Sequence, residues 1–259
     1  MHKCINCIKH MKNMENQDLK RISAAKAAPN DRMLTGIPKQ DIGCHYSSLT
    51  DYLDKAVGYN PKMLSAIDDL IMRFHLGAVT KLVNGHHGTV LPRISRKDKV
   101  VGGSVLYFDT GSGAVLQREI LVEHLYSWYC FSYYIDSEVF FGEHLLSNKP
   151  VAIVQEEKAA LLGTLADPSI DWLAVGEGCN LTDGMMAKLE DKRVVLFPDD
   201  MNYDYWTEKF KGRFKVDNGF IQHDINNYLI DKIKCRGKSI VAESVGEDET
   251  GLCPCYSPL

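Results

Sequence analysis

The sequence predicts an α/β protein in which a parallel sheet flanked by helices follows a small mixed α+β subdomain. Three observations lead to this fold class. After Lys149, short apolar runs alternate with helical patterns, which is typical of βαβ units with right-handed crossovers. Earlier in the chain, apolar residues at helical spacing follow Asn60-Pro61. Alternating apolar residues also flank the turn "DTGSG" at 109–113, as in an antiparallel hairpin.

The first half of the chain is expected to contain two helices and an antiparallel unit. Residues 1–48 show little periodicity and are expected to be irregular. Asn60 is a typical N-cap, and Pro61 suits the first position of the helix that follows. His86 and His87 are expected in a loop. We expect helices over 49–57 and from residue 61, strands over 88–95, 100–108 and 114–122, and a helix over 125–134.

The second half is expected to alternate strands with helices up to residue 245. The predicted strands are 151–155, 172–175, 193–197, 214–217 and 239–242. The predicted helices are 156–166, 181–189, 203–210 and 223–233. A disordered tail is expected to follow, so the chain divides into 1–48, 49–148, 149–245 and 246–259.

Composition narrows the class of protein. The chain has 259 residues and a formal net charge of −4, so the molecule as a whole is not an obvious polyanion binder. No apolar run is long enough to span a membrane, and the polar N-terminus lacks the apolar stretch of a secretory signal. We therefore expect a cytoplasmic protein with no membrane partner, whose eight cysteines are reduced thiols or metal ligands.

Basic residues are concentrated between Arg73 and Lys99. The cluster comprises Arg73, Lys81, Arg93, Arg96, Lys97 and Lys99, and only Asp98 opposes it in the sequence. Arg and Lys make most protein contacts with nucleic-acid phosphates. The candidates for phosphate contacts are Arg93, Arg96 and Lys97. A solvated surface of mixed charge is the competing interpretation.

Acidic residues follow the ends of two predicted strands. Glu156 and Glu157 come after the strand at 151–155, and Asp199 and Asp200 come after the strand at 193–197. Ligands of open parallel sheets bind beyond the carboxyl ends of the strands, and Mg²⁺ prefers oxygen ligands. The competing interpretation is structural, because acids in the first turn of a helix favour its dipole and "PDD" is a common turn.

Several segments resemble the Toprim domain of primase-like proteins carried on bacterial mobile elements. These segments are "KPVAIVQEEKAALLG", "DWLAVGEG", "KRVVLFPDD" and "YDYWTEKF". The upstream "FFGEHLL" and "GTVLPRIS…VVGGSVLYFDTGSG" resemble the basic subdomain that precedes Toprim there and in bacterial replicative primases. The resemblance implies a primase-core-like subdomain at 49–148 and a Toprim-like domain at 149–245. It also implies Mg²⁺- or Mn²⁺-dependent nucleotidyl transfer, namely primer synthesis on single-stranded DNA from nucleotides.

The catalytic positions implied by the resemblance are altered in this chain. The family has Glu-x-Glu-Lys after the first strand, whereas this chain has Gln155 at the first position, followed by Glu157 and Lys158. The family's Asp-x-Asp becomes Asp199 with Met201 at the second position. The catalytic candidates are Gln155, Glu157, Lys158 and Asp199, and the candidate Mg²⁺ ligands are Glu157, Asp199 and Asp200.

These changes leave two hypotheses open. A glutamine oxygen can bind a cation, but it has no negative charge and cannot act as a base. Either Glu156 or Asp200 compensates and the site is active, or the domain is degenerate. A degenerate domain would bind nucleic acid or a replication partner without chemistry. Since the sequence has no GxxxxGK[ST] motif, we expect any unwinding to come from a helicase partner.

A zinc site is a separate candidate at the N-terminus. Cys4 and Cys7 form a CxxC pair, which is half of a zinc site. Cys44 and His45 resemble the last part of the zinc ribbon that precedes Toprim in full-length relatives. The four residues together would complete a tetrahedral site, and a decayed ribbon without zinc is the alternative.

Overall fold

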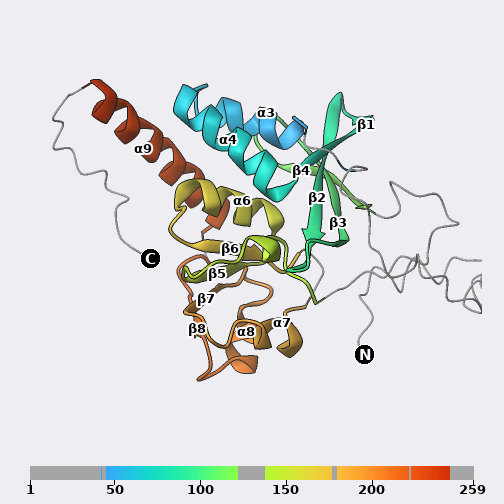
Figure 1. The fold of residues 1–259 in the computed structure, drawn as a ribbon, viewed down its shortest axis with the longest axis vertical. Helices are drawn as coiled ribbons and strands as arrows, with labels where there is room; N and C mark the ends of the chain where they lie inside the picture. The colour runs from blue at the N-terminus through green and yellow to red at the C-terminus, as the bar shows by residue number, and fades with distance from the viewer. Residues whose placement is uncertain (1–41, 43–44, 122–137, 177–179, 222, 246–259) are drawn as a thin grey trace, which may run out of the picture.

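Two four-stranded sheets organise the chain, as Figure 1 shows. The structure is a computed structural model, and it describes residue 42 and residues 45–121, 138–176, 180–221 and 223–245. The first sheet is antiparallel with the strand order β1-β2-β3-β4, and the second is parallel with the order β6-β5-β7-β8. This arrangement confirms the predicted α/β class, with a parallel sheet flanked by helices after a mixed subdomain.

Two helices precede the antiparallel sheet, and both were expected. They are α3 (Ser48–Ala56) and α4 (Pro61–Phe74). The Asn60 side chain accepts hydrogen bonds from the backbone N–H groups of Lys62 and Met63, at 3.1 and 3.3 Å, which confirms it as the N-cap of α4. The apolar stripe of α4 is buried, so the predicted packing face is confirmed.

The antiparallel sheet contains one strand more than predicted. Its strands are β1 (Gly77–Val83), β2 (His86–Ile94), β3 (Val100–Phe108) and β4 (Val115–Ile120). Asn84 and Gly85, both with positive φ, form a two-residue turn that pairs Val83 with His86. The expectation that His86 and His87 lie in a loop was therefore wrong. Asn-Gly is a strong hairpin signal, and here it starts β2 directly.

The parallel sheet is covered on both faces. Its strands and helices are β5 (Val151–Val154), α6 (Glu157–Ala166), β6 (Asp171–Ala174), α7 (Asp183–Ala187), β7 (Val194–Phe197), α8 (Tyr203–Lys209), β8 (Lys215–Val216) and α9 (Ile225–Val245). Figure 1 shows α6 on one side of this sheet and α7 and α8 on the other. Accordingly, Ala152 and Val154 join one core cluster, whereas Val151 and Ile153 join the other. Burial on both faces explains why these strands read as continuous apolar runs.

One predicted strand is wrong. Residues 239–242 belong to the long helix α9, which runs without interruption to Val245. An apolar run of only a few residues does not show whether it is a strand or part of a helix. The predicted helix at 125–134, residues 1–41 and the tail at 246–259 lie outside the described residues. No helix of the described part is long and apolar enough to cross a membrane.

One apolar core crosses the predicted boundary between residues 148 and 149. It includes Leu91 and Leu106 of the antiparallel sheet together with Ala152 of β5 and Leu161 of α6. Before the boundary in sequence, Phe141 exchanges backbone hydrogen bonds with Ala174 at the edge of the parallel sheet. The two sheets are thus fixed relative to each other by shared packing.

The contact between α6 and the parallel sheet is tight at Gly163. A Cβ at this position would lie 2.1 Å from the Trp172 ring, so we expect Gly163→Ala to destabilise the fold by roughly 1–3 kcal/mol through overpacking. The matched control is Gly237→Ala in α9, where the nearest atom would be 3.4 Å away. This control should be neutral or gain up to about 1 kcal/mol from helix propensity. Urea unfolding of both variants measures the difference, and equal stabilities would contradict the prediction.

Candidate functional site

A cleft of about 290 Å³ lies beyond the carboxyl ends of β5 and β7. Its apolar lining includes Val154, Ala159, Phe197, Phe220 and Ile225. Its polar lining consists of Gln155, Glu156, Asp199, Asp200, His223, Asp224 and Asn226. The position is the one at which open parallel sheets bind ligands, so this cleft is the candidate functional site.

The sequence predicted part of this lining and missed part of it. Asp199 and Asp200 lie at the cleft, as their place after a strand suggested, and so does Glu156. His223 and Asp224 were missed because they precede α9, far along the chain. Asp224 accepts a hydrogen bond from the backbone N–H of Asn226 at 2.8 Å, as a residue at the start of a helix does. The predicted helix over 223–233 already placed Asp224 near this helix start, but its distance along the chain from the strand ends hid its place at the cleft.

The aspartates after β7 are arranged in a turn. One carboxylate oxygen of Asp199 accepts hydrogen bonds from the backbone N–H and the side-chain amide of Asn202, at 2.8 and 2.7 Å. Asp200 is exposed, and the Met201 side chain is 87% exposed. Met201, which the resemblance placed at the second aspartate, therefore brings no oxygen ligand to the cleft.

Gln155 is buried at the end of β5, and its amide is engaged by the protein. Its Nε2 donates to the Gly176 carbonyl oxygen at 2.8 Å. The neighbouring Val175 carbonyl oxygen accepts a hydrogen bond of 2.7 Å from Arg93. The amide of Gln155 thus helps to hold the chain after β6, which is a structural role that a carboxylate without a proton cannot fill.

Glu157 points away from the cleft lining and into the contact between the two sheets. Only 1% of it is exposed. Its two carboxylate oxygens accept hydrogen bonds of 3.2 Å, one from Ser104 of β3 and one from Arg118 of β4. Burial by itself would raise the pKa of Glu157, but the charges of Arg118 and Arg93 and the hydrogen bond from Arg118 outweigh it and lower the pKa. Glu157 is therefore an ionised partner of arginine.

Arg93 does not lie on the surface on which we expected it. The residue is 7% exposed, because all of β2 from Gly88 to Ile94 is buried. The burial of Arg93 could not be predicted from the sequence, because a buried arginine needs partners and the spacing of residues does not reveal them. Arg96 and Lys97 are exposed, together with Lys99, at the turn between β2 and β3.

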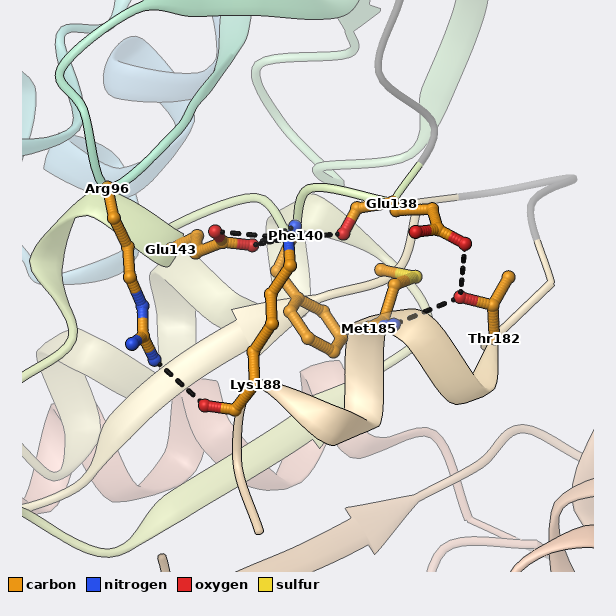
Figure 2. Close-up of polar contacts among 7 residues, drawn as sticks. All are labelled: Arg96, Glu138, Phe140, Glu143, Thr182, Met185 and Lys188. Atoms are coloured by element: carbon orange, nitrogen blue, oxygen red, sulfur yellow. Dashed lines mark hydrogen bonds and ion pairs between the residues drawn. The ribbon is translucent and has the colours of Figure 1, made fainter. Parts of the chain in front are cut away.

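Figure 2 shows how this turn is held against α7. Arg96 donates to the Lys188 carbonyl oxygen at 3.0 Å. The Lys188 ammonium group binds the carboxylate of buried Glu143 at 3.0 and 3.2 Å and the Glu138 carbonyl oxygen at 2.8 Å. Glu143 also accepts a hydrogen bond from the backbone N–H of Phe140 at 3.1 Å. Glu143, the acidic residue of "FFGEHLL", thus has a structural role and does not face the cleft.

Lys158 binds the hairpin turn between β3 and β4. Its Nζ donates to the Gly113 carbonyl oxygen at 3.0 Å. Burial lowers the pKa of Lys158, whereas the charges of Glu156 and Asp224 raise it. The net result is a lowered pKa for Lys158, because the effect of burial outweighs these two charges.

The residues that the Toprim resemblance suggested as catalytic do not fit a Mg²⁺ site as they are arranged. Gln155 is neutral, Glu157 is paired with Arg118, and Met201 has no oxygen ligand, which leaves Asp199 and the exposed Asp200. Within the described residues, no group of three or more Cys, His, Asp or Glu side chains is placed to hold a metal ion. For zinc, Cys4, Cys7 and Cys44 lie outside the described residues, and His45 is exposed.

Comparison with known families gives one match. The family described as "Domain of unknown function (DUF6371)" matches residues 47–200, which is more than half of the chain. The chain belongs to the DUF6371 family. This match covers the antiparallel sheet, the strands β5, β6 and β7 of the parallel sheet, the turn at 95–99 and the strand ends that carry Gln155 and Asp199. A search of curated proteins finds no match to the chain.

Several solved structures of primases are similar to this chain at low identity. The RNA polymerase domain of Mycobacterium tuberculosis primase DnaG is 12% identical, with a TM-score of 0.36, and the match covers 78% of this chain and 88% of that one. The primase fragment of the bacteriophage T7 primase-helicase protein is 13% identical, with a TM-score of 0.44, over 67% and 69% of the two chains. The Aquifex aeolicus primase is 12% identical, with a TM-score of 0.41, over 80% and 62%.

The ion pair of Glu157 predicts a pH-dependent contribution to stability. Glu157→Gln leaves Arg118 without its carboxylate, so we expect a loss of roughly 3 kcal/mol in the free energy of unfolding at pH 7. Because the folded-state pKa of Glu157 is lowered, the wild-type advantage is present above the ordinary carboxyl pKa of about 4.3. It should be lost as the pH falls through the lowered folded value.

Urea unfolding between pH 7 and pH 3.5 tests this expectation. The matched control is Glu190→Gln, which removes an exposed partner of Arg213 and should cost less than about 1 kcal/mol. A Glu157→Gln variant as stable as wild type at pH 7 would contradict the role of the pair.

Proposed function

We propose that this DUF6371 chain is a Toprim-like, primase-type module that binds single-stranded nucleic acid without metal-dependent nucleotidyl transfer. The observation that carries the proposal is the buried ion pair between Glu157 and Arg118. It commits the one glutamate that the resemblance assigns to the metal to another partner. With Gln155 in place of the principal acid, neither position of the first motif supplies a free carboxylate.

Gln155 and Glu157 are also poorly suited to act as a general acid or base. Phosphoryl transfer relies on metal ions that neutralise the developing charge, and on a group that positions or deprotonates the attacking hydroxyl. Gln155 cannot accept a proton as a base, and the Glu157 carboxylate is enclosed by Ser104 and Arg118. The resemblance to Toprim and to mobile-element primases therefore supports the architecture of a nucleic-acid protein more than its chemistry.

The turn between β2 and β3 is the proposed contact with nucleic-acid phosphates. Arg96, Lys97 and Lys99 are exposed there, on the sheet that precedes the cleft in the chain. Arg96 is fixed by its bond to the Lys188 carbonyl oxygen, so the turn presents its charge from a defined place. Positively charged side chains in fixed positions can bind the phosphates of a nucleic-acid backbone without contacting its bases.

A second candidate function is an active nucleotidyl transferase with displaced acids. The observation that favours it is the acidic lining of the cleft, where Glu156 and Asp224 join Asp199 and Asp200. Four carboxylates on one cleft would suit Mg²⁺ or Mn²⁺ if they converged on a single ion. A helicase or another replication protein is the partner class that both candidate functions share.

Primer synthesis on single-stranded DNA separates the two candidates. Wild type and Asp199→Ala are incubated with nucleotides and either Mg²⁺ or Mn²⁺, and labelled products are separated by size. We expect no metal-dependent product from either protein. A product made by wild type and lost in Asp199→Ala would overturn the proposal in favour of the second candidate.

DNA binding is the positive test of the proposal. Fluorescence anisotropy with single-stranded DNA should show binding that weakens with salt. We expect the double variant Lys97→Ala, Lys99→Ala to reduce the slope of log K against log salt by roughly 1.4, since each phosphate contact on a single strand contributes about 0.7.

The matched control for binding is Lys211→Ala, which removes an exposed charge between α8 and β8, away from this turn. It should leave the salt dependence unchanged. Binding that is absent or independent of salt would contradict the proposal, as would an equal effect of Lys211→Ala.

A further inference from the structure

An exposed aromatic ring lies on α8 in a fixed orientation. The Tyr205 residue is 44% exposed, whereas its neighbour Trp206 is buried in the core. The Tyr205 hydroxyl accepts a hydrogen bond of 2.9 Å from Nζ of Lys209, and the same nitrogen donates to the Leu181 carbonyl oxygen at 2.7 Å. This nitrogen also lies 5.2 Å from the centre of the Tyr205 ring. The ring is thus exposed to solvent and oriented by a cation that is itself bound to the backbone before α7.

The short helix α7 connects this ring to the basic turn between β2 and β3. Lys209 binds the carbonyl oxygen of Leu181, just before α7. Arg96 binds the carbonyl oxygen of Lys188, at the other end of the helix (Figure 2). Leu181 and Lys188 are seven residues apart, so at a helical rise of about 1.5 Å per residue the two carbonyl groups lie roughly 10 Å from each other. At about 3.4 Å per nucleotide of a stacked strand, this distance corresponds to about three nucleotides.

The charges near Tyr205 favour an uncharged group over a phosphate. Asp204 and Glu208 are exposed on the same helix, and their carboxylates would repel a phosphate. A nucleobase has no charge and offers a π face, and proteins that bind single strands combine such stacking on aromatic side chains with positive groups along the backbone. A strand with its phosphates at the basic turn would therefore place an uncharged base, and not a phosphate, at α8.

We infer that Tyr205 is a stacking platform for an unpaired base of the single strand whose phosphates bind the turn of Arg96, Lys97 and Lys99. This inference rests on the proposed function, and it adds a base contact to the phosphate contacts proposed there. It requires a single strand, because the bases of a duplex already stack on one another. Tyr205 acts through its ring and makes no phosphate contact.

Fluorescence anisotropy with two labelled strands tests the inference on the full chain. One strand is oligothymidine, and the other is an abasic strand of the same length, which keeps the phosphates and lacks the bases. We expect wild type to bind oligothymidine at least roughly fivefold more tightly than the abasic strand, which is the size of effect that stacking of one base on an aromatic side chain has. The Tyr205→Ala variant should lose most of this preference.

Two further variants separate stacking from other effects of the substitution. Tyr205→Phe keeps the ring and should keep the preference for oligothymidine. Both Tyr205 variants should keep the wild-type slope of log K against log salt, because no phosphate contact is removed. The matched control is Tyr59→Ala, which removes a residue that is 60% exposed between α3 and α4. Figure 1 shows these two helices on the far side of the parallel sheet from α7 and α8, so the control should bind as wild type does.

Equal binding of the two strands by wild type would overturn the inference, and this comparison needs no variant to fold. A Tyr205→Ala variant that keeps the preference for oligothymidine would also overturn it, as would an equal loss in Tyr59→Ala. These results leave the proposed function in place as long as binding by wild type weakens with salt. Binding of single strands that is absent or independent of salt would overturn the proposed function itself.

Discussion

The ion pair between Glu157 and Arg118 is the interaction on which the arrangement of this molecule depends. It joins the first turn of α6 to the edge strand β4, so that one charged contact connects the parallel sheet to the antiparallel one. A buried carboxylate without a partner would cost several kcal/mol. Ser104 and Arg93 complete its surroundings, and these residues come from the two central strands of the antiparallel sheet. The relative position of the sheets and the ionisation of Glu157 therefore both depend on the same contact.

The same need for charge balance accounts for the rest of the site. Arg93 is drawn into the contact and bonds the chain beyond β6, where the Gln155 amide bonds the next carbonyl group. Glu143 is matched by Lys188 on the far side of the sheet, which in turn places the turn of Arg96. In each case a cation of the protein stands beside the acid. Glu157 and Glu143 are thus neutralised by cations of the protein within the fold.

The sequence predicted the elements better than it predicted the partners of the charged residues. Periodicity placed α4, β3 and the βαβ alternation, because packing faces repeat locally along the chain. It also placed Asp199 at a cleft, since strand ends share one edge of a sheet. It did not show that Glu157 faces Arg118, which lies 39 residues away on a different sheet. Nor did it show that Arg93 is buried. The local sequence of β2 is the same whether or not a carboxylate from a distant part of the chain lies beside the arginine.

The neutral side chain of Gln155 fits the contact that it makes at the end of β5. The Nε2 group of Gln155 faces the Gly176 carbonyl oxygen, so the site presents an acceptor to the residue at this position. A glutamate there would place two acceptors against each other, and it would need either a proton or a metal ion to hold the same contact. A neutral amide satisfies the carbonyl group without either. The Gln155 amide therefore stabilises the end of β5 together with the chain after β6, as part of the fold.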